Sequence, residues 1–248
     1  MSSPRIEVHE DASDLATAAA GELLMRLVDG QSEGGVPHIG LTGGGIAESV
    51  HREIARLAPL SEVDWNRVVV WWGDERFVAP DSPDRNALDA RASFLSVVGI
   101  PEQNIHEMPS TATAESAEAG ATAYGDDLRA QGVGQFEVLM LGMGPDGHVA
   151  SLFPGHAALD VSDQIAVAVL DSPKPPPERI SLTFAALNHS KSVWFLVSGE
   201  AKADAVARAL AGTGEGGVAA EVHDVPAVGV TGHDETIWFL DRASASHL

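Results

Sequence analysis

The sequence contains no cysteine, and only three of its 248 residues are lysines. Without cysteine there can be no disulfides, no thiolate nucleophile and no cysteine-ligated zinc or iron. No apolar run approaches the roughly 18 residues that a membrane span needs, and the first residues lack the basic and apolar segments of a leader. These absences suit a protein of the reducing cytoplasm and predict no membrane partner.

Positive charge is also scarce, since 15 basic residues face 36 acidic ones and the formal net charge is -21. Such a chain cannot present the broad electropositive surface that nucleic acid binds, so no nucleic-acid partner is expected. The acidic residues are scattered along the chain, as on a solvated surface. An anionic ligand would need a local basic pocket, which makes any cation beside a glycine-rich loop informative.

Short apolar runs alternate with helical patterns along the whole chain. The apolar runs lie at residues 6–9, 38–42, 67–72, 137–142, 165–170, 192–197 and 236–240. The helical patterns lie at 11–30, 46–58, 86–98, 114–131 and 200–211. Near-continuous apolar runs are typical of parallel strands buried on both faces. The alternation predicts a single α/β domain over residues 1–248, with an open, mostly parallel, doubly wound (Rossmann-like) sheet and helices on both faces.

Two segments interrupt the alternation without marking a domain boundary. Residues 171–180 are proline-rich and are expected to form an extended loop, and residues 212–217 form a glycine-rich turn. In an open parallel sheet, ligands bind at the loops that follow the carboxyl ends of strands. Candidate functional residues are therefore sought in those loops.

The first such loop is "LTGGGIAESV" at 41–50, where Gly43, Gly44 and Gly45 lead into a helix. Glycines let the backbone turn tightly and direct amide N–H groups at an anion, and a helix N-terminus adds the positive end of its dipole. A phosphate would fit there, although a plain strand-to-helix turn has the same pattern. The P-loop lysine is missing, so a nucleoside triphosphate is not implied.

The second loop places Asp74, Glu75 and Arg76 directly after a buried strand. These residues could form an ordinary surface ion pair, which contributes little to stability. Alternatively, Arg76 could bind a phosphate with two hydrogen bonds while a carboxylate orients a catalytic group. The position of the loop after a strand favours the functional interpretation.

The third loop, "LGMGPDGHVASLFPG" at 141–155, resembles a dinucleotide-binding fingerprint through Gly142, Gly144 and Gly147. That fingerprint requires a long helix after the glycines. Pro154 would end such a helix after barely two turns, so dinucleotide binding is disfavoured.

The same loop suits proton transfer, because Asp146 stands two residues before His148. A carboxylate can fix the imidazole ring, and histidine is suited to moving protons near neutral pH. A histidine that only satisfies a structural hydrogen bond is the alternative. His156 lies eight residues further on, a spacing that supports no metal site. Two further cations follow such segments: Arg179 stands at the end of the proline-rich loop, and Lys202 follows the apolar run at 192–197. Each could be a solvated side chain or could balance the charge of an anionic ligand.

Taken together, "LTGGG", "WWGDERFV", "LGMGPDGHVASLFPG", "RISLT" and "SGEAK" resemble the 6-phosphogluconolactonases, and the similarity spans nearly the whole chain. This resemblance implies an enzyme of the pentose phosphate pathway that hydrolyses 6-phosphoglucono-δ-lactone with no cofactor and no required metal. It implies His148 as general base and Asp146 as its orienting partner. The resemblance places the substrate among the remaining candidates, which are Thr42, Gly43, Gly44, Gly45, Asp74, Glu75, Arg76, Gly142, Gly144, Gly147, Arg179 and Lys202. Thr42 stands where many members carry serine, and it either takes over that hydroxyl contact or loses it.

Two alternatives of the same fold stay open. Glucosamine-6-phosphate deaminases share the glycine loop and the Gly-x-Asp-Gly-His stretch, but their pattern after the histidine is Phe-Asn-Glu-Pro, whereas this chain has "SLFPG". The missing glutamate and the presence of Arg76 favour the lactonase. A non-catalytic sugar-phosphate effector domain is the other alternative, and the net charge of -21 argues against its DNA-binding partner segment.

Overall fold

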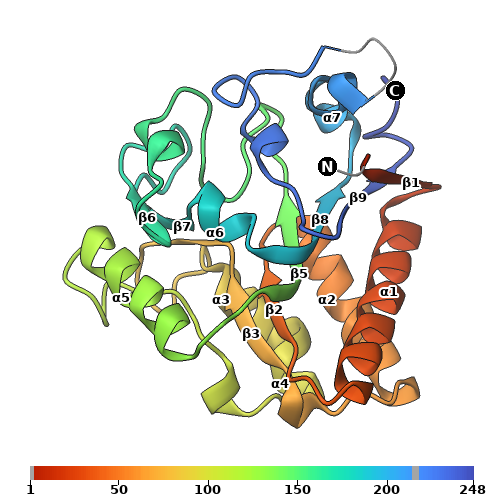
Figure 1. Ribbon diagram of the computed structural model, residues 1–248, viewed down its shortest axis with the longest axis vertical. Helices are drawn as coiled ribbons and strands as arrows, with labels where there is room; N and C mark the ends of the chain where they lie inside the picture. The colour runs from red at the N-terminus through yellow and green to blue at the C-terminus, as the bar shows by residue number, and fades with distance from the viewer. Residues whose placement is uncertain (1–2, 214–217) are drawn as a thin grey trace.

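The computed structural model describes residues 3–213 and 218–248, and its centre is a six-stranded parallel sheet (Figure 1). The strands run in the order β1-β9-β8-β5-β2-β3. Their bounds are β1 Arg5–His9, β2 His38–Leu41, β3 Val69–Trp72, β5 Phe136–Gly142, β8 Ser190–Val197 and β9 Glu235–Asp241. Every neighbouring pair in this sheet is parallel. The predicted parallel sheet is therefore confirmed.

A second, antiparallel sheet of three strands packs beside the first. Its order is β4-β7-β6, with β4 Asp74–Arg76, β7 Arg179–Leu182 and β6 Ala166–Val169. The expectation that 165–170 belongs to the main sheet was wrong, and the predicted loop at 171–180 ends in a strand. A four-residue apolar run indicates burial but not the sheet in which it pairs. Gly73 joins the two sheets, because its carbonyl accepts the N–H of Leu182 at 2.9 Å.

Seven α-helices are present in the described part of the chain. They are α1 Ala12–Ser32, α2 Gly45–Leu57, α3 Asn86–Ala90, α4 Ser96–Val98, α5 Ala117–Ala130, α6 Phe184–Leu187 and α7 Ala203–Leu210. Helix α1 begins where the Asp11 carboxylate accepts the N–H groups of Ser13 and Asp14 at 2.8 and 3.0 Å. The helix predicted at 86–98 is interrupted by a π-helical turn at Arg91–Leu95. None of these helices is both long and apolar enough to cross a membrane.

The main sheet is covered on both faces, and two adjacent tryptophans show how. Trp71 and Trp72 follow one another in β3, so their side chains point to opposite faces. Trp72 packs into a core with α1, α2 and α3, whereas Trp71 packs into a second core with α5, α7 and the small sheet. Figure 1 shows α1 and α5 on opposite sides of the strands. Helices on both faces, as predicted, thus bury near-continuous apolar strands.

The parallel register aligns the carboxyl ends of the central strands. Leu41 at the end of β2 pairs with Trp72 at the end of β3, and Gly142 at the end of β5 pairs with Leu196 of β8. The loops that follow these strands therefore open at the same edge of the sheet. The glycine-rich turn predicted at 212–217 falls mostly on residues outside the described ranges.

Candidate active site

His148 and Asp146 form a hydrogen-bonded pair in the loop after β5. The Nδ1 atom of His148 lies 2.5 Å from Oδ1 of Asp146, and the imidazole packs on Phe153 with 4.6 Å between ring centroids. Burial alone would raise the pKa of Asp146, but hydrogen bonds and charges from His148 and Lys174 lower that pKa well below its usual range. Asp146 therefore stays ionised and fixes the ring through Nδ1, which leaves Nε2 for proton transfer.

The glycines around this pair shape the loop. A Cβ on Gly144 would lie 2.0 Å from Nδ1 of His148 and 2.3 Å from Oδ1 of Asp146, so only glycine allows the close approach. The N–H of Gly144 donates to the carbonyl of His148 at 3.0 Å, and the N–H of Gly147 donates to the carbonyl of Gly144 at 2.9 Å. Gly144 and Gly147 therefore act on the geometry of the loop, while Gly142 lines a neighbouring cavity.

Lys174 joins the pair from the proline-rich loop that follows β6. Its Nζ lies 3.1 Å from Nδ1 of His148 and 3.2 Å from Oδ2 of Asp146. The sequence does not predict this contact, because 26 residues separate Lys174 from His148 and the loop belongs to the other sheet. The only signal was the rarity of lysine in the chain and the position of this lysine just after a strand.

Arg179, which the resemblance places at the substrate, is bound to the main chain of the proline-rich loop. Its guanidinium donates to the carbonyls of Lys174, Pro175 and Pro176 at 3.1, 3.2 and 3.2 Å, and the residue is only 5% exposed. The guanidinium also lies 5.5 Å from the ring centroid of Phe153. Three main-chain acceptors use this side chain, so Arg179 holds the loop that carries Lys174.

A cavity of about 410 Å³ lies beside the histidine loop and contains the predicted anion-binding residues. Gly43, Gly44 and Gly45 line it where α2 begins, and Lys202 lines it from the segment before α7. Burial lowers the pKa of Lys202, nearby Lys174 adds to this effect and Asp146 opposes it. Main-chain N–H groups, a helix N-terminus and an ammonium group are the features that bind a phosphate.

The cavity and the histidine loop share a wall at Met143. Lys202 Nζ donates to the carbonyl of Met143 at 2.7 Å. Met143 in turn pairs with Val149, the residue after His148. The site that could bind an anion and the site that could transfer a proton therefore adjoin each other at Met143.

Arg76 lies beside the glycine loop, and Asn86 connects the two. The Nη1 atom of Arg76 donates to the carbonyl of Asp84 at 3.1 Å and to Oδ1 of Asn86. The same Oδ1 packs so closely on Gly43 that a Cβ there would lie 1.8 Å away. Sequence reasoning missed Asn86, whose role depends on a contact between segments more than 40 positions apart.

Glu75, which the resemblance places against the substrate, is enclosed by internal contacts. The residue is 1% exposed, and its carboxylate accepts the N–H groups of Arg76, Asn86 and Ala87 at 2.8, 2.9 and 2.9 Å. Burial raises the pKa of Glu75, and the charge of Arg85 and these N–H groups lower it. All of these contacts are internal, so Glu75 anchors the start of α3.

Asp74 and Thr42 are also buried and join neighbouring loops. Asp74 is 6% exposed and accepts the hydroxyl of Ser151 at 2.6 Å, which ties β4 to the histidine loop. Thr42 is 6% exposed as well, and its hydroxyl accepts the N–H of Gly142 at 3.4 Å. These internal contacts hold the loops together, and the contacts of the two side chains with substrate stay a prediction.

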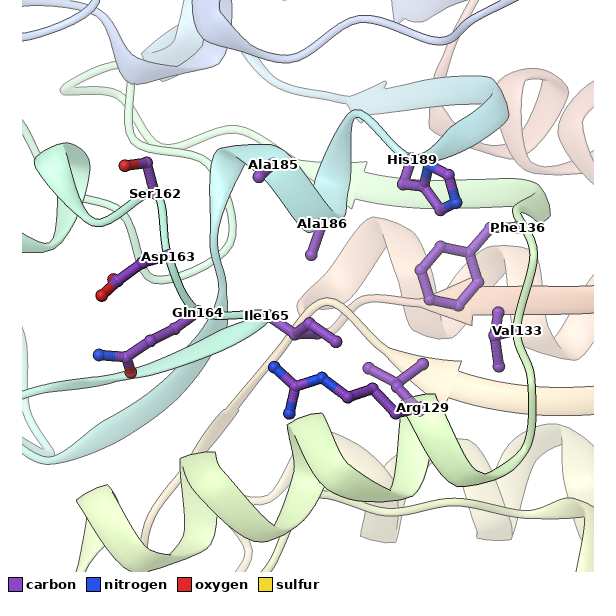
Figure 2. A pocket seen from close by; sticks show the side chains of 11 residues that line it. Arg129, Val133, Phe136, Ser162, Asp163, Gln164, Ile165, Ala185, Ala186 and His189 are labelled. Carbon is purple, nitrogen blue, oxygen red and sulfur yellow. The ribbon is translucent and has the colours of Figure 1, made fainter.

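Another cavity, of about 380 Å³, lies between α5 and α6 and is shown in Figure 2. Phe136, the first residue of β5, and His189, just before β8, both line it. It therefore lies at the amino edge of the sheet, opposite the end of β5 that carries His148. Within residues 3–213 and 218–248, no group of three or more histidines and carboxylates could hold a metal ion.

Comparison with known proteins shows the family of this chain. The family model described as glucosamine-6-phosphate isomerases/6-phosphogluconolactonase matches residues 10–238. The chain belongs to this family. It is 39% identical to a 6-phosphogluconolactonase of Streptomyces coelicolor, over 99% of this chain and 95% of the relative. It is 41% identical to the 6-phosphogluconolactonase of Mycobacterium tuberculosis, over 99% of both.

Solved structures of the family have the same fold. The crystal structure of 6-phosphogluconolactonase from Thermotoga maritima superimposes with a TM-score of 0.80 and 27% sequence identity. The superposition covers 96% of this chain and 99% of that chain. This chain thus shares its α/β architecture with that structure over nearly the whole length of both.

Proposed function

We propose that this chain hydrolyses 6-phosphoglucono-δ-lactone to 6-phosphogluconate, with His148 as the general base. The observation that carries the proposal is that the His148–Asp146 pair adjoins, through Met143, the glycine-lined cavity that Lys202 also lines. A lactone with a remote phosphate needs these two features side by side. Relatives 39% and 41% identical to this chain are named 6-phosphogluconolactonases, which supports the same substrate.

In the proposed reaction, Nε2 of His148 removes a proton from water as the water oxygen bonds to the lactone carbonyl carbon. The carbonyl π electrons move onto oxygen and form a tetrahedral intermediate. When the intermediate collapses, the bond between the carbonyl carbon and the ring oxygen breaks, and the imidazolium donates its proton to that oxygen. The products are a carboxylic acid and a free hydroxyl. Asp146 keeps the ring oriented and stabilises the imidazolium.

The phosphate of the substrate is proposed to lie in the cavity lined by Gly43 to Gly45, with Lys202 and Arg76 as the nearby cations. Holding this remote group positions the ring at His148 and removes part of the entropic cost of the reaction. The proposed location is the cytoplasm, which suits a sequence without cysteine.

A pH-stat assay tests the proposal directly. Purified protein is added to freshly prepared 6-phosphoglucono-δ-lactone, and acid release is compared with spontaneous hydrolysis. A parallel assay measures ammonia formed from glucosamine 6-phosphate. Rapid acid release without ammonia is the expected result. Ammonia without accelerated acid release would assign the chain to deaminase chemistry. If neither product forms, a non-catalytic sugar-phosphate-binding domain would be the remaining interpretation.

A further inference from the structure

Lys174 contacts both members of the His148–Asp146 pair. Its Nζ lies 3.1 Å from Nδ1 of His148, and 3.3 and 3.2 Å from the two carboxylate oxygens of Asp146. The ammonium and the Nδ1–H group are both donors, so they cannot bond to each other. They share one acceptor, the carboxylate, which brings two groups of like polarity into close contact.

These neighbours act on the imidazole in opposite directions. A carboxylate beside a histidine favours its protonated form, which is unable to take a proton from water. A cation beside the ring disfavours that form. An Asp146–His148 pair without a third group would therefore lose its base over part of the acidic pH range, and Lys174 supplies the charge that opposes this loss.

Other charged groups around the pair are mostly cationic. Arg208 donates to the carbonyl of Asp146 at 3.3 Å, and Lys202 reaches the carbonyl of Met143 in the same loop. Arg179 lies 5.5 Å from the ring centroid of Phe153, and Asp74 is the carboxylate that acts most strongly on it. Among all of these, only Lys174 reaches hydrogen-bond distance of both the ring and the Asp146 carboxylate.

The ammonium is held in place by the loop. Arg179 binds three successive carbonyls, starting at Lys174 itself, and Ser172 donates its hydroxyl to the carbonyl of Lys174 at 3.0 Å. The Lys174 Nζ lies 5.9 Å from the ring centroid of Phe153. It lies on the Nδ1 side of the imidazole, away from Nε2. In this geometry the positive charge of Lys174 acts on the protonation of the imidazole ring and not on the lactone carbonyl.

We propose that Lys174 is a positioning residue whose charge, held against the His148–Asp146 pair, extends the activity toward acidic pH. This inference rests on the proposed role of His148 as general base. The Lys174 side chain is 39% exposed, so solvent screens its charge and limits the effect. Removing the charge should move the acidic limb of the kcat/KM profile upward by about one pH unit.

The test compares kcat/KM of wild type and Lys174→Met between pH 5 and pH 9. At pH values above the acidic limb, kcat/KM of the variant should stay within a few-fold of wild type. About one pH unit below the wild-type midpoint, kcat/KM of the variant should be roughly tenfold lower than that of wild type at the same pH. Lys174→Arg, which keeps the charge, should restore the wild-type limb. Lys191→Met is the matched control, because Lys191 is paired with Glu137 at 2.8 Å on the other edge of the sheet. Its profile should not change.

A second readout follows the His148 ring by NMR, with its signals assigned from their absence in His148→Asn. In Lys174→Met, the midpoint of His148 protonation should move to higher pH by the same amount as the rate limb. Lys174→Gln replaces the methionine variant if a lower Tm shows that the methionine variant is poorly folded.

Two results would overturn the inference. One is an unchanged acidic limb in the folded variants. The other is a uniform fall of kcat at every pH with an unchanged His148 titration, which would place Lys174 against the substrate. Failure of the proposed function gives a different result: the wild type would not accelerate lactone hydrolysis, or His148→Asn would retain the activity, whatever the NMR titration shows.

Discussion

Two polar clusters at the same edge of the sheet differ in how much of their hydrogen-bonding capacity is used internally. Glu75, after β3, is 1% exposed and accepts three main-chain N–H groups. His148, after β5, has an 18% exposed side chain, and of its two ring nitrogens only Nδ1 has a hydrogen-bond partner within the described residues. Both residues come shortly after an apolar strand of the main sheet. The difference teaches that a saturated buried group builds the frame, whereas an unsaturated accessible group is available for substrate.

The largest effect should come from removing the proton acceptor of the accessible cluster. His148→Asn should lower kcat/KM by about 10²–10⁴-fold, because asparagine cannot take a proton from water. The amide can still donate to Asp146 from a position like that of Nδ1, so Tm should stay within a few degrees of wild type. His233→Asn, at a side chain 71% exposed, is the control and should keep wild-type activity. A loss smaller than tenfold in His148→Asn would exclude His148 as the base.

In the buried cluster, the main effect should be on stability. Glu75→Gln replaces Oε2, which accepts the N–H of Ala87, with a donor, and removes the charge that faces Arg85 at 3.9 Å. Urea titration should show a loss of about 3 kcal/mol in unfolding free energy. KM of the folded enzyme should change little.

The control for this buried substitution is Glu10→Gln, at a side chain 60% exposed, which should cost less than about 0.5 kcal/mol. The distinction between the two clusters would be contradicted if Glu75→Gln affected substrate binding and not stability. Unchanged stability with a raised KM would mean that Glu75 meets the substrate.

The sequence predicted the main sheet well because its strands are apolar on both faces, as in β5 and β8. It did not predict the small sheet, since β6 and β7 are short and β7 also pairs with β4, which follows Gly73 where the chain leaves the main sheet. Local patterns indicate which residues are buried. They do not indicate which strand lies alongside.

The same limit explains the outcome for the candidate site. Asp146 and His148 are two residues apart, so the sequence itself places them together, and the structure brings them into contact. Lys174 and Asn86 reach their partners only through the tertiary fold. Arg179 was expected at the substrate from the resemblance, and no sequence pattern reveals that its Nε and Nη2 donate to loop carbonyls.

Arg76 tests the boundary between the clusters, since it comes from the buried segment but lies beside the glycine loop. Arg76→Ala should raise KM by about tenfold and change kcat less, because the positive charge is lost from the phosphate side of the site. Arg76→Lys should recover part of the affinity. Initial rates over a range of lactone concentrations measure both constants, and an unchanged KM in Arg76→Ala would assign Arg76 to the frame with Glu75.

The smallest effect concerns the pH dependence of stability at Asp146. The pKa of Asp146 is lower in the folded protein, so its carboxylate contributes stability that is fully present above the usual aspartate range near pH 4. That contribution is lost as the pH falls through the lowered folded-state pKa. The difference in unfolding free energy between wild type and Asp146→Asn should therefore be largest at pH 6–7 and should shrink toward pH 3. It should not exceed about 1 kcal/mol, because the side chain is 33% exposed and solvent screens it.

Asp126→Asn is the matched control for this pH dependence, since Asp126 is 66% exposed and pairs with Arg129 on the surface. Its effect on unfolding free energy should be small and almost constant from pH 7 to pH 3. A flat difference for Asp146→Asn as well would mean that His148 and Lys174 do not hold the carboxylate ionised. The accessible cluster would then lack the charge interactions that distinguish it from the buried cluster. The proposed role of Lys174 would be excluded as well.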